Sequence, residues 1–325
     1  MLRRGEIDSS SLQAKATAPH PALFFRSGTG LLENMINSHP DLNRSQQRHA
    51  ISLMLLSTAG FTANILLIRA FGHYGSGNVW FLVCMRFVAG LAVITSLYHR
   101  EFRPLNLFRN PRLIARGIIG AVGTTAYYLA IVHLGAGRAT FIGNTYVIWG
   151  ALMAVWILSE KFTTILAIGC ITTLTGLALL THVISTGLHP GPYDFLAMVS
   201  AIASAIVVIL IRQLHAKEHT STIFAAQCVY GLMICGVPAI LHTEAFPVTA
   251  WLILIAASLT AAFGQLTMTR AYRDMSVGEG SLLQMLVPLG VAVGGVVLFR
   301  EYFSPTESIG AALILIGSVM PALRR

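Results

Sequence analysis

Arg86 is the residue in this sequence whose type and position most clearly suggest binding chemistry. It lies seven residues into an apolar stretch that begins at residue 79 and holds no acidic side chain. If that stretch is a membrane-spanning helix, Arg86 lies about 10 Å deep. A guanidinium at that depth is costly unless water, helix carbonyls or an anion surround it. Because its planar fork fits a carboxylate, we predict that Arg86 binds the negative group of a substrate. An arginine that snorkels or bonds to helix carbonyls is the structural alternative.

Seven other polar or aromatic side chains lie within apolar stretches and are predicted to line the same substrate-binding site. They are Asn64, Tyr128, Asn144, Trp149, Gln227, Gln265 and Gln284. We expect Asn144 near the outer mouth of a pathway and Gln284 near the inner mouth, a placement that suits two gates. For each residue, an interhelical hydrogen bond or plain packing is the alternative role.

A further group of residues is predicted to be structural. Glu160 and Glu301 lie at span ends, where a carboxylate stabilises the free N–H groups at the start of the next helix. Close helix packing and helix geometry are the expected roles of Gly169, Gly176, Gly310, Gly317 and Pro288. We expect no catalytic residue, cofactor or metal, because the four cysteines and eleven histidines show no ligand spacing and no GxxxxGK motif occurs.

The composition indicates that these residues are positioned by membrane-spanning helices. The chain has 325 residues, of which 55% are hydrophobic and 11% charged, with a mean hydropathy of +0.70. Soluble domains carry about 25% charged residues, so a soluble enzyme, a nucleic-acid-binding domain and a disordered protein are excluded. About 20 apolar residues cross a bilayer as a helix. Ten such runs are predicted, at 51–70, 79–98, 114–133, 140–158, 164–183, 193–211, 222–241, 250–270, 280–299 and 305–322.

The distribution of basic residues predicts the orientation of these spans. With the N-terminus in the cytoplasm, 18 of the 22 Lys and Arg fall on the inner side, counting Arg116 as a loop residue, and three fall outside. This bias follows the positive-inside rule and predicts that both termini are cytoplasmic. Residues 1–48 hold no long apolar run and are predicted to form a disordered cytoplasmic tail. The protein is expected in a bacterial cytoplasmic (inner) membrane.

The sequence contains an internal repeat. Shifting residues 121–176 by 141 positions aligns them with 262–317 without a gap, so that Glu-x-Phe at 160–162 meets Glu-x-Phe at 301–303. The two predicted units are 49–185 and 190–323, each with five spans. Because five is odd, the second unit enters the membrane from the opposite side, which gives the inverted repeats of many secondary transporters. A membrane scaffold or sensor and an intramembrane enzyme are the alternatives, and the enzyme would lack paired catalytic residues.

The repeat motifs resemble those of the EamA-type permeases of the drug/metabolite transporter superfamily. The resemblance covers about residues 50–322 and rests on four features: the fourth-span ends WILSEKF (156–162) and LFREYF (298–303), the glycine-spaced helix ESIGAALILIGSVM (307–320), Pro288, and the first-span ends ILLIRAF (65–71) and VILIRQL (208–214). It implies ten helices in two repeats around a central cavity lined by the first four helices of each. The first half departs from the family pattern, since NTYVIWG (144–150) lacks the proline that the family commonly has in both halves.

These observations predict an all-α polytopic membrane protein with ten helices in two inverted five-helix repeats. The predicted function is a permease that moves a small metabolite, such as an amino acid or another carboxylate-bearing compound, by alternating access. A nucleotide-derived or drug-like substrate and a non-transporting scaffold are the alternatives. The expected partners are a small-molecule substrate and the lipid bilayer, with no nucleic acid, and a homodimer is left open.

Overall fold

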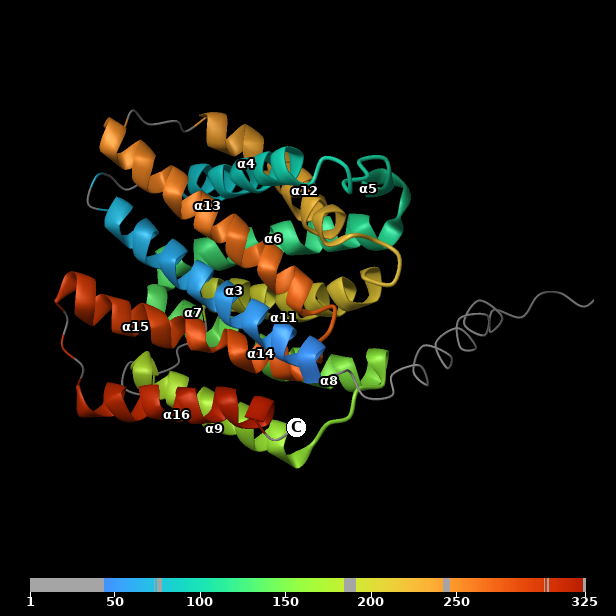
Figure 1. Cartoon of the computed structure of the whole chain (residues 1–325). Helices are drawn as coiled ribbons and strands as arrows, with labels where there is room; N and C mark the ends of the chain where they lie inside the picture. The colour runs from blue at the N-terminus through green and yellow to red at the C-terminus, as the bar shows by residue number, and fades with distance from the viewer. Residues whose placement is uncertain are drawn as a thin grey trace, which may run out of the picture. The chain divides into compact units, whose positions relative to one another are not determined.

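The computed structural model describes residues 44–72, 74, 78–183, 191–241, 246–300, 302 and 304–323. Within them every regular element is a helix (Figure 1). The predicted all-α class with two five-helix repeats is confirmed. Most of the predicted tail, the boundary region 185–190 and Glu301 lie outside the described residues. The first helix begins at Arg44, inside the segment that the sequence predicts to be tail.

All ten predicted apolar runs lie in helices. The first repeat contains α3 (Arg44–Phe71), α4 (Val79–Leu97), the short α5 (Asn106–Arg109), α6 (Pro111–Leu134), α7 (Ala136–Asn144), α8 (Tyr146–Leu158) and α9 (Thr164–Leu180). The second contains α11 (Pro192–Leu214), α12 (Thr220–Leu241), α13 (Val248–Ala271), α14 (Val277–Gln284), α15 (Leu286–Phe299) and α16 (Pro305–Leu323). In the described part, nine segments are long and apolar enough to span a membrane, while α9 is a shorter apolar helix of 17 residues.

The fourth span of each repeat is a helix broken near its middle. In the second repeat α14 ends at Gln284, four residues before Pro288. Pro288 has no N–H to donate to the Gln284 carbonyl, and its ring clashes with that carbonyl. The helix is therefore interrupted there. The first repeat breaks at the corresponding place without a proline. There the Thr145 hydroxyl donates to the Ile142 carbonyl at 2.6 Å, a local hydrogen bond that competes with the helical pattern.

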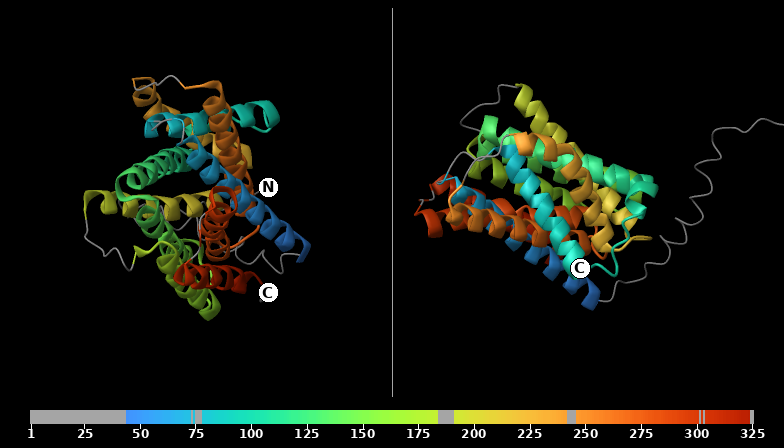
Figure 2. Two further views of the ribbon diagram at one scale, coloured as in Figure 1. Left: turned by 90° about the vertical axis from the view of Figure 1, so that its left-hand side faces the viewer. Right: turned by 90° about the horizontal axis from the view of Figure 1, so that it is seen from above.

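Helices of one repeat pack mainly on helices of the other. Contacts join α4 to α12 and α13, α6 to α11 and α12, and α9 to α16. The α9–α16 pair lies at one edge of the bundle (Figures 1 and 2). Its close approach comes from the four predicted glycines: a β-carbon on Gly176 would lie 2.6 Å from the Gly310 carbonyl oxygen, and one on Gly169 would lie 2.9 Å from that of Gly317. A β-carbon on Gly310 would likewise lie 2.6 Å from the Gly176 carbonyl oxygen, and one on Gly317 would lie 2.9 Å from that of Gly169.

The position of Arg116 differs from the sequence prediction. The charge count treats Arg116 as an inner loop cation, although it lies two residues into the predicted run 114–133. α6 begins earlier, at Pro111, with Asn110 as a cap whose side chain accepts from the Arg112 N–H at 3.1 Å. Asn followed by Pro is a recognised helix-start signal. Arg116 therefore lies inside the helix and is fully buried, and it no longer counts among the inner loop cations. The charge bias of the other basic residues is unaffected.

Candidate functional site

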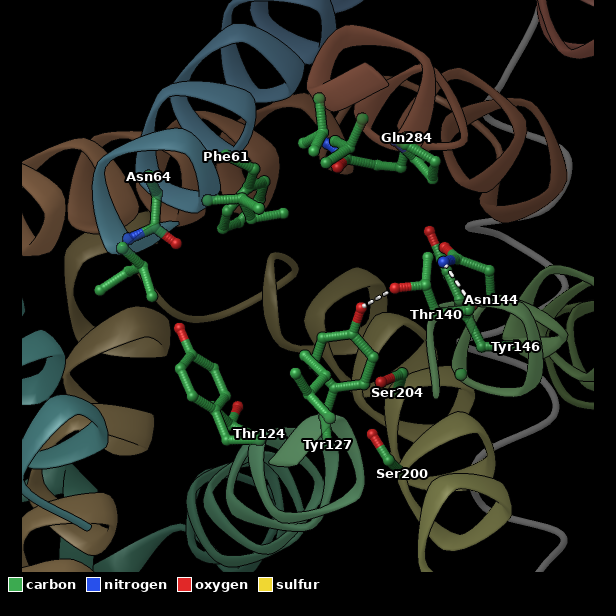
Figure 3. A pocket seen from close by; sticks show the side chains of 18 of the residues that line it. Phe61, Asn64, Thr124, Tyr127, Thr140, Asn144, Tyr146, Ser200, Ser204 and Gln284 are labelled. Atoms are coloured by element: carbon green, nitrogen blue, oxygen red, sulfur yellow. Dashed lines mark hydrogen bonds between the residues drawn. The ribbon is translucent and has the colours of Figure 1, made fainter. Parts of the chain in front are cut away.

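A cavity of about 1260 Å³ lies between the two repeats. Its walls come mainly from α3, α4, α6 and α7 of the first repeat and from α11 to α15 of the second, and α8, α9 and α16 contribute one residue each: Tyr146, Leu180 and Glu307. Figure 3 shows Asn64 on α3, Tyr127 on α6 and Gln284 on α14 around the same space. The lining is mostly apolar with a few polar groups, as in sites for small molecules.

The cavity reaches one end of the bundle and stops short of the other. It is lined by Arg69 at the end of α3 and by Tyr302, whose side chain is 94% exposed. We call this the open end. The opposite ends of α8 and α11, at Leu158 and Leu214, do not contribute to the lining. We call that side the closed end.

Seven of the eight residues predicted to bind substrate line this cavity. They are Asn64, Arg86, Tyr128, Asn144, Gln227, Gln265 and Gln284. Trp149 does not line it, and it lies on α8 with 38% of its surface exposed. Asn144 and Gln284 were expected at opposite mouths, but each ends the first half of a broken helix and both face the same cavity (Figure 3).

Arg86 is a half-buried cation on the cavity wall. One guanidinium nitrogen, Nη2, donates to Gln265 Oε1 at 3.3 Å, and the group lies 5.4 Å from the centre of the Phe61 ring. No acidic side chain in the described part of the chain pairs with it. Among the described lining residues Glu307, near the open end, is the single acid. Arg86 thus gives the cavity a positive charge that no acidic side chain among the described residues pairs with.

Two amide side chains on the walls are held by hydrogen bonds between helices of the two repeats. Asn64 Nδ2 donates to the Ala257 carbonyl at 2.8 Å, which joins α3 to α13. Gln284 Nε2 donates to Ser57 Oγ at 2.8 Å and ties the break after α14 to α3. These bonds hold the amides in fixed orientations and link the repeats, which is the alternative role that the sequence left open.

The cavity wall also carries a pair of hydroxyl groups that the sequence does not predict. The hydroxyls of Tyr127 on α6 and Thr140 on α7 lie 3.1 Å apart, and the Asn144 side chain donates to the Thr140 carbonyl at 2.8 Å (Figure 3). The Tyr127 hydroxyl was visible in the sequence as a polar group within a span. Its pairing with Thr140 could not be read from the sequence because it depends on how α7 folds back along α6.

The closed end contains an ionic contact between the repeats. Glu160 was predicted to cap the next helix, α9, but Thr163 caps that helix by accepting from the Leu166 N–H at 3.3 Å. The Glu160 carboxylate instead accepts from the Val277 N–H at 2.9 Å and pairs with Arg212 Nε at 3.2 Å. Glu160 thus caps the first turn of α14, in the other repeat. We call Glu160, Arg212 and Val277 the closed-end clamp.

The backbone before Glu160 explains this position. α8 ends at Leu158 and is followed by Ser159, whose φ of 54° lies in the left-handed region and turns the chain sharply. Arg212 is held in turn by the Met275 carbonyl, 2.6 Å from its Nη1. Burial raises the pKa of the Glu160 carboxyl, while the Arg212 charge and the Val277 N–H act in the opposite direction.

Comparisons with known proteins agree with this architecture. The model of the EamA-like transporter family matches twice, over residues 48–182 and 191–322. The pseudopaline exporter CntI of Pseudomonas aeruginosa, from strains PAO1 and UCBPP-PA14, is 22% identical over 240 residues, which is 73% of this chain and 84% of the exporter. A solved crystal structure has a TM-score of 0.70 at 18% identity, covering 84% of this chain and 96% of its own. With one family match over each repeat, the chain belongs to the EamA-like transporter family.

Proposed function

We propose that this transporter carries a small metabolite with a carboxylate or similar anionic group, and that Arg86 binds that group. The observation that supports this most strongly is the charge of the cavity. Arg86 lies on a wall between the repeats with no acidic partner among the described residues. An uncompensated guanidinium within a membrane is costly, so a bound anion would stabilise it.

Alternating access is the proposed mechanism. Inverted repeats around a central site can rock so that the site opens to each side in turn. In this conformation the cavity reaches the open end, while the closed-end clamp joins Glu160 to α11 and α14. Opening the other side would require these contacts to separate. The clamp is thus the proposed gate of this conformation.

The proposed orientation follows from the charge bias. Excess Lys and Arg on the closed side supports an orientation in which that side and both termini lie in the cytoplasm of a bacterial cell and the open end faces outward. Because the relatives from Pseudomonas aeruginosa are named as exporters, export is the direction to test first.

Transport by the purified full-length chain in proteoliposomes tests the proposal. A panel of labelled amino acids and small carboxylates would be measured with the native protein, Arg86→Lys and Arg86→Gln. We expect Arg86→Lys to raise the apparent KM at least about tenfold, because a lysine cannot form the bidentate contact. Arg86→Gln should nearly abolish transport at normal membrane levels. Native rate and affinity in a folded Arg86→Gln protein would overturn the anion-binding role.

A further inference from the structure

A second arginine, Arg116, lies buried behind the wall of the cavity. It is fully buried on α6, and its Nη2 donates to Gln227 Oε1 at 2.9 Å. In the part of the chain that the structure describes, Arg116 Nε and Nη1 have no hydrogen-bond partner, and no acidic side chain pairs with the group. A buried charge of this kind is strongly unfavourable without an ion or several hydrogen bonds to compensate it.

Only thin parts of the wall separate this guanidinium from the cavity. Gln227 lines the cavity, and so does Gly120, one turn along α6 from Arg116. A β-carbon on Gly120 would collide with Arg116 Nη1. The guanidinium therefore fills the space that a side chain at this wall position would take. Gly120 and the Gln227 amide lie between its positive charge and the cavity.

The repeat relation makes this arrangement the counterpart of the Arg86 site. A shift of 141 residues takes position 86 to 227 and position 124 to 265. The contact of Arg86 with Gln265 accordingly has a counterpart, in which Gln227 Nε2 donates to Thr124 Oγ1 at 3.0 Å. The Arg86–Gln265 contact includes a cation, whereas the Gln227–Thr124 contact joins two neutral side chains. Arg116 supplies the missing cation by bonding to the same Gln227.

Each half of the cavity thus has a guanidinium whose Nη2 is bonded to a glutamine Oε1: Arg86 to Gln265 and Arg116 to Gln227. Arg86 thus joins α4 to α13, and Arg116 joins α6 to α12. Apart from Glu307 near the open end, the described lining residues offer no carboxylate to either. An anionic ligand would therefore balance the charge that the described lining residues leave uncompensated.

We infer that Arg86 and Arg116 form two cationic centres, so that the preferred substrate carries two anionic groups, as a dicarboxylate does. This rests on the proposed function, because it adds a second charge to the substrate class that Arg86 selects. Arg86 contacts the first anionic group directly. Arg116 acts through Gln227 as a positioning residue, since it fixes the amide and adds a positive potential at the second group.

The test uses three probes of nearly the same size but different charge: glutarate, its monoamide glutaramate, and the neutral diamide. Ligand binding raises the unfolding temperature of the native state, so each probe would be titrated against the full-length protein in detergent. We expect glutarate to stabilise the unaltered chain at a concentration about tenfold or more below that of glutaramate, and the diamide to have no effect. This comparison does not depend on any variant folding.

A variant that neutralises the charge of Arg116, compared with a matched control, then tests whether Arg116 is the second cationic centre. Gln227→Glu places a carboxylate of the same shape against Arg116, so glutarate should lose its advantage and bind no better than glutaramate. Gln213→Glu, on α11 outside the cavity lining, adds the same charge and should behave as the unaltered chain. Equal binding of glutarate and glutaramate to the unaltered chain, no stabilisation by glutarate, or a retained preference in folded Gln227→Glu would overturn the inference.

Arg86→Gln in the same assay separates this inference from the proposed function. If Arg86→Gln abolishes binding of both acids while Gln227→Glu changes nothing, a single anionic site at Arg86 stands and the second centre falls. If Arg86→Gln binds both acids as the unaltered chain does, the proposed function itself falls.

Discussion

At the scale of single residues, two arginines set the charge near the cavity: Arg86 lies on its wall, and Arg116 is buried behind that wall. Arg86 is identifiable because it interrupts an apolar run well inside the span. Arg116 has the same chemistry but lies near the start of its helix and is counted with the loop cations, although the predicted run 114–133 includes it; α6 begins three residues before that run, at Pro111. The Asn110–Pro111 pair was the signal that could have corrected this.

His215 gives a pH-dependent prediction at this scale. Burial lowers its pKa to about 4, although its hydrogen bond to the Thr269 carbonyl, at 2.7 Å, acts in the opposite direction. An unfolded chain takes up this proton near pH 6.5. The contribution of neutral His215 to stability is thus complete above pH 6.5 and is lost as the pH falls toward 4.

We expect the thermal stability of the native protein to fall between pH 6.5 and pH 4.5 more steeply than that of His215→Gln. The difference should be roughly 1–2 kcal/mol at pH 5. His99→Gln, at an exposed position, is the matched control and should follow the native curve. Parallel curves for the native protein and His215→Gln would contradict this assignment.

At the scale of helices, the sequence predicts the spans well but not their interruptions or contacts. Glycine spacing in the fifth and tenth spans indicated close packing, and the structure places Gly169 against Gly317 and Gly176 against Gly310. The break after Asn144 was not predicted because no proline marks it. The cap that Glu160 provides to α14 was also missed, because it joins segments more than 100 residues apart.

Gly176→Ala should destabilise the α9–α16 pair. Its new methyl group would lie 2.6 Å from a carbonyl oxygen of the facing backbone, so the two helices must separate, at a cost of about 1–3 kcal/mol. Gly236→Ala on α12 is the control, since nothing lies within 4 Å of the added atom. Thermal unfolding in detergent should show a lower melting temperature for the first variant alone. Equal melting temperatures would argue against a packing role for Gly176.

The closed-end clamp should show a graded response to substitution. Glu160→Gln keeps an oxygen for the Val277 N–H but loses the ion pair with Arg212, whereas Glu160→Ala loses both contacts. We expect Glu160→Ala to cost about 2–3 kcal/mol and Glu160→Gln less, because the pair is largely buried. Melting temperatures of these variants and of the exposed control Glu101→Gln would check the order. A Glu160→Ala protein as stable as the control would show that the clamp contributes nothing.

At the scale of the whole molecule, the internal repeat was the most informative feature of the sequence. The match of Glu160–Phe162 to 301–303 predicted two five-helix units, and the family match covers both. The cavity between them could be expected from the resemblance. Which end of the cavity is open and which is closed could not be predicted, because several conformations of a transporter share one sequence.

The inverted arrangement predicts the sides of the two repeat ends. Reporter fusions after residues 187 and 325 should report opposite sides of the membrane, with the second in the cytoplasm, because five spans separate them. Alkaline phosphatase and a fluorescent protein would serve as reporters active on opposite sides. If both fusions report the same side, the ten-span topology is wrong.

Access to the cavity from both sides is the most direct test of the central claim. Ser204 lines the cavity on α11 (Figure 3), and a cysteine there, in a chain whose four native cysteines are replaced by alanine, would be exposed to a membrane-impermeant maleimide applied to right-side-out and to inside-out vesicles. We predict that Ser204→Cys is labelled from both sides, whereas the control Lys217→Cys, at the closed end, is labelled from the cytoplasmic side alone. Labelling of Ser204→Cys from one side alone, in a protein that still transports, would contradict alternating access.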